Sequence, residues 1–166
     1  GVENWTMKGM EFAAHDGRTL NGQGLSYATS NRGADHMYSV AYDYEYPLVS
    51  PAEAMEKEGV AGKSEKIIEL ENLKAVRDSG VLCQFSSSYT EEERYEAVFQ
   101  TDYDRLMDVG SRIVELERHF HNRRGKDRSD DEALPYELEG LAEELSRYYD
   151  QRGWNDDGTV PAENVE

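Results

Sequence analysis

The sequence predicts a mainly helical protein whose first third is rich in loops. Apolar residues recur at steps of three and four residues in several segments after residue 60, whereas glycine and aromatic residues dominate the first fifty positions. Hydrophobic residues make up 37% of the chain and charged residues 32%, which favours amphipathic helices over strands buried on both faces. Because 166 residues is the length of one domain, we expect a loop-rich segment (1–50) and a helical segment (51–166) to form one compact helical unit.

The N-terminal half contains signals for three helices. One short helix is expected around Gly24–Asn31. Ser50–Glu53 combines an N-cap hydroxyl, a proline at the first helical position and a carboxylate at the third, and Gly59 would end the helix that follows. From Glu65 to Asp78, apolar residues lie on one side of a helix that is expected to stop near Gly80.

The C-terminal half contains signals for three more helices. Thr90–Glu93 is a capping box that precedes an apolar stripe, and the longest helix is expected from Asp102 to about His121. The apolar stripes of the two C-terminal helices are Leu106, Val109, Ile113, Leu116 and Phe120, and Leu138, Leu141, Leu145 and Tyr148. We expect these two helices to bury their stripes by packing antiparallel, and the tail after Gly153 to fray.

The charge balance excludes several classes of partner. The chain carries 35 acidic and 18 basic residues, a formal net charge of -17, so nucleic acid and anionic membrane surfaces are disfavoured. No segment has the composition of a membrane helix or a signal peptide, and cytoplasmic location is the simplest expectation. The acidic excess indicates either an ordinary solvated surface or a halophilic protein, and the latter predicts stability that increases with salt.

Three segments carry residues suited to chemistry. Lys8–Arg18 crowds ionisable residues together, as a functional site or a surface loop with an internal ion pair would. Glycines in Gly22–His36 could let the backbone approach an anionic cofactor or could simply punctuate a helix. Asp78–Phe85 contains Cys83, the single cysteine, which could be a buried apolar residue or a reactive or metal-bound thiolate.

In this order and spacing, the three segments resemble the aldehyde ferredoxin oxidoreductase family. The family has a Lys-Gly-x-Glu stretch leading to Asp-x-Arg, then Gly-x-Gly-x-x-Tyr-Ala-Thr-x-Asn-Arg-Gly ending in His, then Asp-x-x-Gly-Leu-Cys. The matching residues are Lys8, Gly9, Glu11, Asp16, Arg18, Gly22, Gly24, Tyr27, Ala28, Thr29, Asn31, Arg32, Gly33, His36, Asp78, Leu82 and Cys83. The stretches Leu116–Arg118, Asn122–Gly125, Asp131–Pro135 and Tyr148–Trp154 are also similar to the family's C-terminal helices.

The resemblance implies tungsten held by the dithiolenes of two pyranopterins beside a 4Fe-4S cluster. Such an enzyme oxidises aldehydes to carboxylates and passes the electrons to ferredoxin. Asp78 would hydrogen-bond a pterin ring, Leu82 would lend backbone contacts, and Cys83 would be one of four thiolate ligands to the cluster. His36 would lie near tungsten as a proton-handling imidazole, the alternative being a structural histidine at a helix end. Residues 1–50 would then be the cofactor-facing segment.

The chain also departs from the family pattern. Gly80 lies one place before the family's glycine, and Asp35 precedes His36 where the family usually has a small residue or Cys. The Cys-x-x-Cys-x-x-x-Cys run of the other cluster ligands and the β-rich domain are missing. We therefore expect a C-terminal fragment of a larger multidomain enzyme, inactive alone and without bound cofactor. Its partners would be the N-terminal domains of the same enzyme, ferredoxin and an aldehyde.

Two other functions remain open from the sequence. Within the same family, the chain could be part of the tungsten subunit of an aromatic-ring reductase of the benzoyl-CoA type. From a different class, it could be a non-catalytic acidic helical interaction module.

Overall fold

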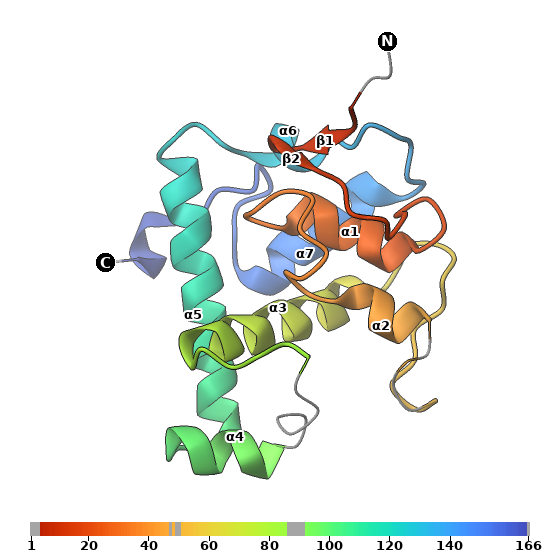
Figure 1. Cartoon of the computed structure of the whole chain (residues 1–166). Coiled ribbons are helices and arrows are strands. Elements are labelled where there is room, and N and C mark those ends of the chain that lie inside the picture. The colour runs from red at the N-terminus through yellow and green to blue at the C-terminus, as the bar shows by residue number, and fades with distance from the viewer. Residues whose placement is uncertain (1–3, 47, 49–50, 86–91, 166) are drawn as a thin grey trace.

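A helix of 16 residues, α3 (Ser64–Ser79), lies at the centre of the fold (Figure 1). The computed structural model describes residues 4–46, 48, 51–85 and 92–165. The other elements are β1 (Thr6–Met7), β2 (Met10–Glu11), α1 (Asn21–Thr29), α2 (Ala41–Glu45), α4 (Glu92–Phe99), α5 (Tyr103–Asn122), α6 (Arg128–Asp131), α7 (Leu141–Arg152) and a 3-10 helix (Ala162–Asn164). The two strands form an antiparallel hairpin. The expected mainly helical fold is confirmed.

The central helix α3 contacts α1, α5 and α7 (Figure 1). It buries Ile67, Leu70 and Val76, the apolar side that its periodicity predicted. The closest approach is to α5, where a Cβ on Gly110 would lie 2.2 Å from the backbone oxygen of Asn72. The absence of a side chain at this glycine is therefore what allows α5 to cross α3 at short distance.

The main core draws on the N-terminal segment and on the C-terminal helices together. Tyr27 of α1 and Tyr148 and Tyr149 of α7 are fully buried. Trp154 packs edge-on against Tyr148, with ring centroids 5.7 Å apart. Buried tyrosines thus supply core volume that the few aliphatic residues do not.

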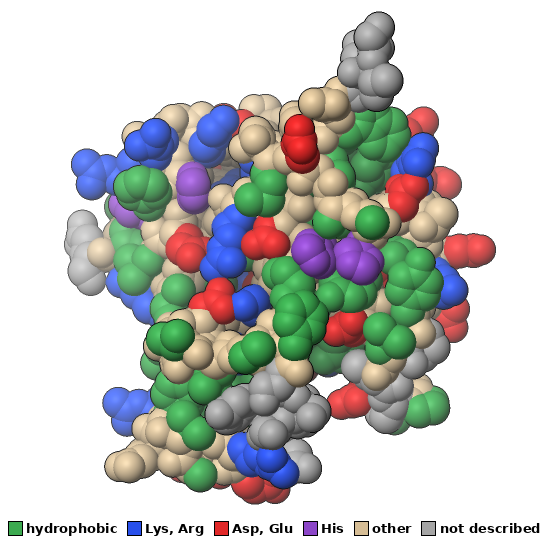
Figure 2. Space-filling view, in the orientation of Figure 1, with side chains coloured by type: hydrophobic (Ala, Val, Ile, Leu, Met, Phe, Trp, Pro, Cys, Tyr) green, Lys and Arg blue, Asp and Glu red, His purple; other side chains and the backbone are tan. Residues whose placement is uncertain are grey.

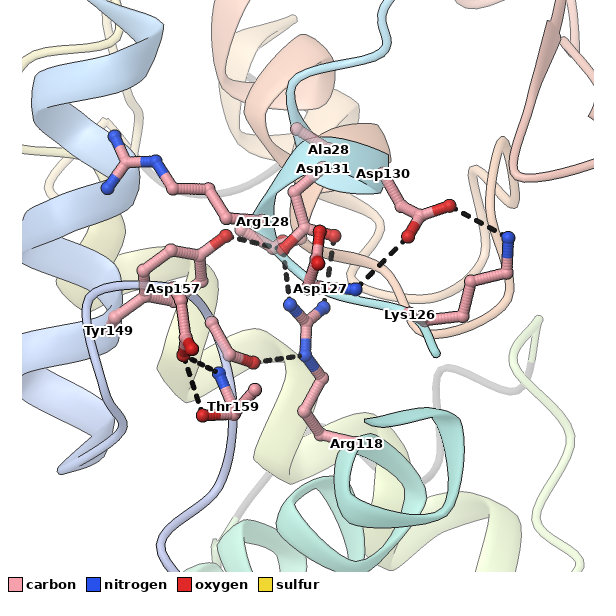
Figure 3. Close-up of polar contacts among 12 residues, drawn as sticks. Ala28, Arg118, Lys126, Asp127, Arg128, Asp130, Asp131, Tyr149, Asp157 and Thr159 are labelled. Atoms are coloured by element: carbon pink, nitrogen blue, oxygen red, sulfur yellow. Dashed lines mark hydrogen bonds and ion pairs between the residues drawn. The ribbon is translucent and has the colours of Figure 1, made fainter. Parts of the chain in front are cut away.

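A buried polar cluster around Asp131 joins the N-terminal hairpin to α5, α6 and α7 (Figure 3). Its carboxylate binds the Arg118 guanidinium at 3.0 and 2.8 Å, and it accepts a hydrogen bond from the Tyr149 hydroxyl at 2.5 Å. Lys8, in the loop between β1 and β2, lies 2.5 Å from the same carboxylate and donates to two carbonyls at the end of α1. Each buried charge therefore has an opposite charge or a hydrogen-bond partner, as burial requires.

The helix expected after Ser50 does not form in the described residues. Ser50 itself lies outside them, Pro51–Glu53 is a turn, and positions up to Gly59 are irregular and largely exposed. The capping signals act only within the segment itself. Because almost none of the segment is buried, a short helix there would gain too little stabilisation from packing to form. Of the capping box before α4, Thr90 and Glu91 lie outside the described residues, whereas α4 itself is confirmed.

The expected packing of the two C-terminal helices on each other is wrong, because α5 and α7 both pack mainly on α3. Helix α5 buries one side consisting of Leu106, Gly110, Val114 and Arg118. That side is turned away from most of the expected apolar stripe. Val109, Leu116 and Phe120 are exposed, and the fraction exposed reaches 57% at Phe120. By contrast, the expected C-terminal stripe is buried: Leu141, Leu145 and Tyr148 lie in α7, and Leu138 lies three residues before that helix begins.

The expectation that the tail frays is also wrong. Trp154 and Val160 are buried, and the Gly158 carbonyl accepts a hydrogen bond from Arg118 at 2.8 Å. These contacts hold the turn after α7 against α5.

Among the described helices, none has both the length and the apolar character needed to cross a membrane.

Candidate functional site

His36 lies in the loop between α1 and α2, which hydrogen bonds hold in place. The Asp35 carboxylate accepts a hydrogen bond from the Met37 amide at 2.9 Å, and the hydroxyls of Ser39 and Ser26 are 2.5 Å apart in a buried contact. The carboxylate that precedes His36 therefore stabilises the turn. His36 is half-buried and lies within the loop rather than at the end of α1 or the start of α2.

Two aromatic side chains accompany His36. The His15 ring lies 4.9 Å from the His36 ring between centroids, and it stacks on the Tyr42 ring at 3.9 Å and 7°. On the face shown in Figure 2, histidine side chains lie side by side next to hydrophobic ones. The segment that contains His15 thus supplies part of the same site as His36.

Asp78 lies in the last turn of α3 and is bound by two cations. Arg32 donates to one carboxylate oxygen at 2.9 Å, and Lys74, one helical turn earlier, binds the other oxygen. Burial alone would raise the pKa of Asp78, but the hydrogen bonds from Lys74 and Arg32 outweigh burial and lower it. Asp78 is therefore a carboxylate at neutral pH and can accept hydrogen bonds from N–H groups.

Arg32 connects Asp78 to the loop that carries His36. Its guanidinium lies 3.4 Å from the Asp35 carboxylate and 2.9 Å from that of Asp78. The structure thus brings together two segments that are more than forty residues apart in the sequence.

A cavity of about 230 Å³ opens beside Asp78. It is lined by Arg32, Tyr38, Glu71, Lys74, Ala75, Asp78, Ser79, Ile113, Val114 and Glu117. A second hollow of about 380 Å³ shares Arg32, Ile113 and Glu117 with the first and extends along α5 to Leu116 and Phe120. The exposed stripe of α5 therefore borders the hollows at the candidate site.

The loop after α3 places Leu82 and Cys83 next to Asp78. The Leu82 amide donates to the Arg77 carbonyl and the Val81 amide to the Asp78 carbonyl, which is the Schellman arrangement at a helix end. In this arrangement Val81 has φ of 56°, the left-handed conformation that favours glycine. Val81 occupies the place of the family's glycine.

Glycine is needed at position 80 for a different reason. The φ of Gly80 is -83°, which any residue adopts, but a Cβ there would lie 2.6 Å from the Phe99 ring. The left-handed residue at the end of α3 is therefore Val81, although the glycine stands one position earlier.

Cys83 is exposed, so of its two alternatives the buried apolar residue is wrong. Arg77 donates from one nitrogen to the carbonyls of Cys83 and Gln84, both at 3.1 Å, which fixes the backbone that carries the thiol. Leu82 packs against a small apolar cluster formed by α3, α4 and α5. The thiol is thus accessible to solvent, on a loop whose backbone is held by the hydrogen bonds from Arg77.

The residues present fit one ligand position of an iron-sulfur cluster and do not make a complete metal site. Such a cluster takes four protein ligands, of which this chain offers Cys83. Within the described ranges, no three His, Cys, Asp or Glu side chains come together to hold a metal ion.

An acidic side chain binds the N-terminus of α1, which lies among the glycines before His36. The amides of Gly22 and Gln23, which start α1, donate to the Glu45 carboxylate at 2.7 and 2.9 Å. This carboxylate also pairs with Lys63 at 3.0 Å. The helix N-terminus is therefore occupied by an acidic side chain of the same chain, which supports the simpler interpretation of this motif.

Three site residues were missed in the sequence. Arg32 and His15 lie inside motifs that drew attention as whole segments, but nothing local showed their contacts with Asp78 and His36. Lys74 precedes Asp78 by four residues, the spacing of a helical ion pair, and could have been found from that spacing.

Comparison with known proteins identifies the family of the chain. Residues 4–166 match the family model described as "Aldehyde ferredoxin oxidoreductase, domains 2 & 3". The chain is 32% identical to the tungsten-containing aldehyde ferredoxin oxidoreductase of Pyrococcus furiosus over 97% of its own length. It is also 32% identical to the enzyme of that name from Thermococcus kodakarensis, again over 97% of its length.

The chain spans about 30% of the length of each of these relatives. The family match covers more than 160 positions and includes every segment of the candidate site. The chain belongs to the aldehyde ferredoxin oxidoreductase family.

Proposed function

We propose that this chain is the C-terminal part of a tungstopterin oxidoreductase that oxidises aldehydes to carboxylic acids and delivers the electrons to ferredoxin. The observation that carries the proposal is the Arg32 bridge, because it joins Asp78 to the loop of His36 beside one cavity. The names and family of the relatives support the same chemistry. We also propose that the enzyme is located in the cytoplasm.

The chain's own residues have separate roles in this proposal. The Asp78 carboxylate would accept hydrogen bonds from pterin N–H groups, and the backbone at Leu82 would contact the same cofactor. The Cys83 thiolate would be one of four cluster ligands, supplied from a loop that Arg77 holds. His36 would hold or release a proton at an imidazole nitrogen during aldehyde oxidation. The tungstopterin, when bound, would supply the two-electron redox chemistry.

The exposed stripe of α5 indicates where the rest of the enzyme would pack. Val109, Leu116 and Phe120 form an apolar strip that borders the hollow of about 380 Å³. A large exposed apolar strip on an otherwise charged surface is typical of an interaction site. We propose that other domains of the same enzyme cover this strip and close the cofactor site.

Metal analysis of the complete enzyme tests the proposal. In enzyme produced with tungsten and iron available, Cys83→Ser should lower the iron content or change the cluster's reduction potential, while tungsten is retained. Val81→Ser, in the same loop, is the matched control and should leave both metals unchanged. An unaltered cluster in Cys83→Ser would remove the ligand role.

A second measurement tests Asp78. Asp78→Asn should reduce the pterin content, whereas Asp108→Asn on the exposed side of α5 should not. A complete protein without tungsten or iron would instead favour a non-catalytic module that uses the α5 strip to bind its partner.

A further inference from the structure

Three aromatic rings from three different segments meet at His36. His15 comes from the loop before α1, His36 from the loop after it, and Tyr42 from α2. The His15 ring lies between the other two, with centroids 3.9 Å from Tyr42 and 4.9 Å from His36. The centroids of Tyr42 and His36 are 5.9 Å apart. His15 is therefore the immediate neighbour of the proposed proton-handling residue.

The structure holds His15 in this position from two sides. Its backbone carbonyl accepts a hydrogen bond from the hydroxyl of the buried Tyr27 at 2.8 Å. The residue on which it stacks is held through its backbone, since the Tyr42 amide donates to the Gln23 side-chain oxygen at 3.2 Å. Parallel stacking at 7° leaves the opposite face of the His15 imidazole directed away from Tyr42.

The charges around His15 oppose its protonation. Burial lowers the pKa of His15, the neighbouring His36 lowers it further, and Asp43 partly opposes both effects. The adjacent Asp16 carboxylate is bound by Arg18 at 2.6 Å, so its charge is largely compensated. Two imidazoles this close repel each other when both are protonated.

We propose that His15 is a positioning residue for His36 and that the two imidazoles act as one acid–base unit that carries a single proton. The inference rests on the proposed function only for the role of His36. His15 keeps the pair from becoming doubly charged and sets the orientation of the neighbouring ring through its own stack on Tyr42. The arrangement follows the general rule that a catalytic imidazole works with a second group that fixes its state.

The first experiment measures the titration of His15 in this chain by NMR of the imidazole C–H signals. In His36→Phe, the pKa of His15 should rise toward its ordinary value, because a neighbouring positive charge is removed. His119→Phe, which removes an imidazole without a ring contact to either residue, should leave the titration of His15 unchanged. The same titration of His15 in wild type and in His36→Phe would overturn the proposal.

The second experiment uses the complete enzyme and His15→Phe, which retains a flat ring for the stack on Tyr42 but cannot carry a proton. We expect turnover about tenfold lower, within the lower part of typical acid–base effects, and an acid limb of the pH profile moved to higher pH. KM should change little. His15→Tyr, also planar, should give the same displacement, whereas a wild-type pH profile in both variants would overturn the proposal.

Two activity measurements distinguish failure of the proposed function from failure of the acid–base pairing. If His36→Ala leaves turnover unchanged, the proposed function fails at that residue. If His36→Ala abolishes turnover while the pH profile is indifferent to His15, only the acid–base pairing is overturned.

Discussion

Replacing Val81 with glycine should stabilise the chain by about 0.5–1 kcal/mol. Val81 has φ of 56°, and a left-handed conformation costs a residue with a side chain about 1–2 kcal/mol. Glycine would relieve that cost but would lose about 0.4–1 kcal/mol through the greater freedom of the unfolded chain. The Val81 side chain is 90% exposed, so its removal sacrifices little packing.

Urea denaturation of the wild type, Val81→Gly and Val81→Ala, followed by circular dichroism, measures this difference. Alanine keeps the Cβ and therefore most of the strain, so it is the matched control and should gain less than glycine. In a thermal melt of the same variants, the expected gain for Val81→Gly in a chain of 166 residues is about 1–4 °C in melting temperature. A Val81→Gly chain that is less stable than the wild type would refute the argument from backbone strain.

Other substitutions test the packing and the charges. Gly110→Ala should cost about 1–3 kcal/mol in the same assay, because its Cβ would meet the Asn72 oxygen; equal stability would mean that α5 is not held close to α3. Asp131→Asn should cost about 3–5 kcal/mol because it leaves Arg118 buried without its anion, and a loss below 1 kcal/mol would contradict the buried cluster. Asp78→Asn should be less stable than wild type at pH 7. The lowered pKa of Asp78 gives stability that is present above the ordinary value of 3.8 and lost as pH falls through the lowered value, so the difference should disappear in acid; a difference independent of pH would exclude the ion pairs as its cause.

Sequence periodicity predicted most of the helices, because apolar residues spaced three or four apart fall on one side of a helix. It could not show which side of α5 is buried, since that depends on the close approach at Gly110. Arg118 lies on the buried side because Asp131 compensates its charge, and this pairing is invisible in a hydrophobic pattern. The helix predicted after Ser50 does not form in the part of the chain that the structure describes, because its capping signals are local and its side chains are not buried against the rest of the protein.

Within the candidate site, the motifs identified the segments but not their contacts. His36, Asp78, Leu82 and Cys83 were all selected from the sequence, and the structure places Asp78 and the His36 loop on the same arginine. The solvent exposure of Cys83 could not be foreseen, because the apolar helix before it ends in a turn that directs the thiol outward. Long-range partners such as Arg32 and His15 depend on chain folding rather than on spacing.

The exposed strip on α5 has a consequence for colloidal behaviour. With a net charge of -17, copies of the chain repel one another at low ionic strength and keep their apolar strips apart. Near 1 M salt the screening length falls to about 3 Å, so this repulsion no longer acts between molecules whose strips approach. High salt therefore relieves the charge repulsion within one molecule and also removes the repulsion between molecules. Copies of the chain would then associate through Val109, Leu116 and Phe120.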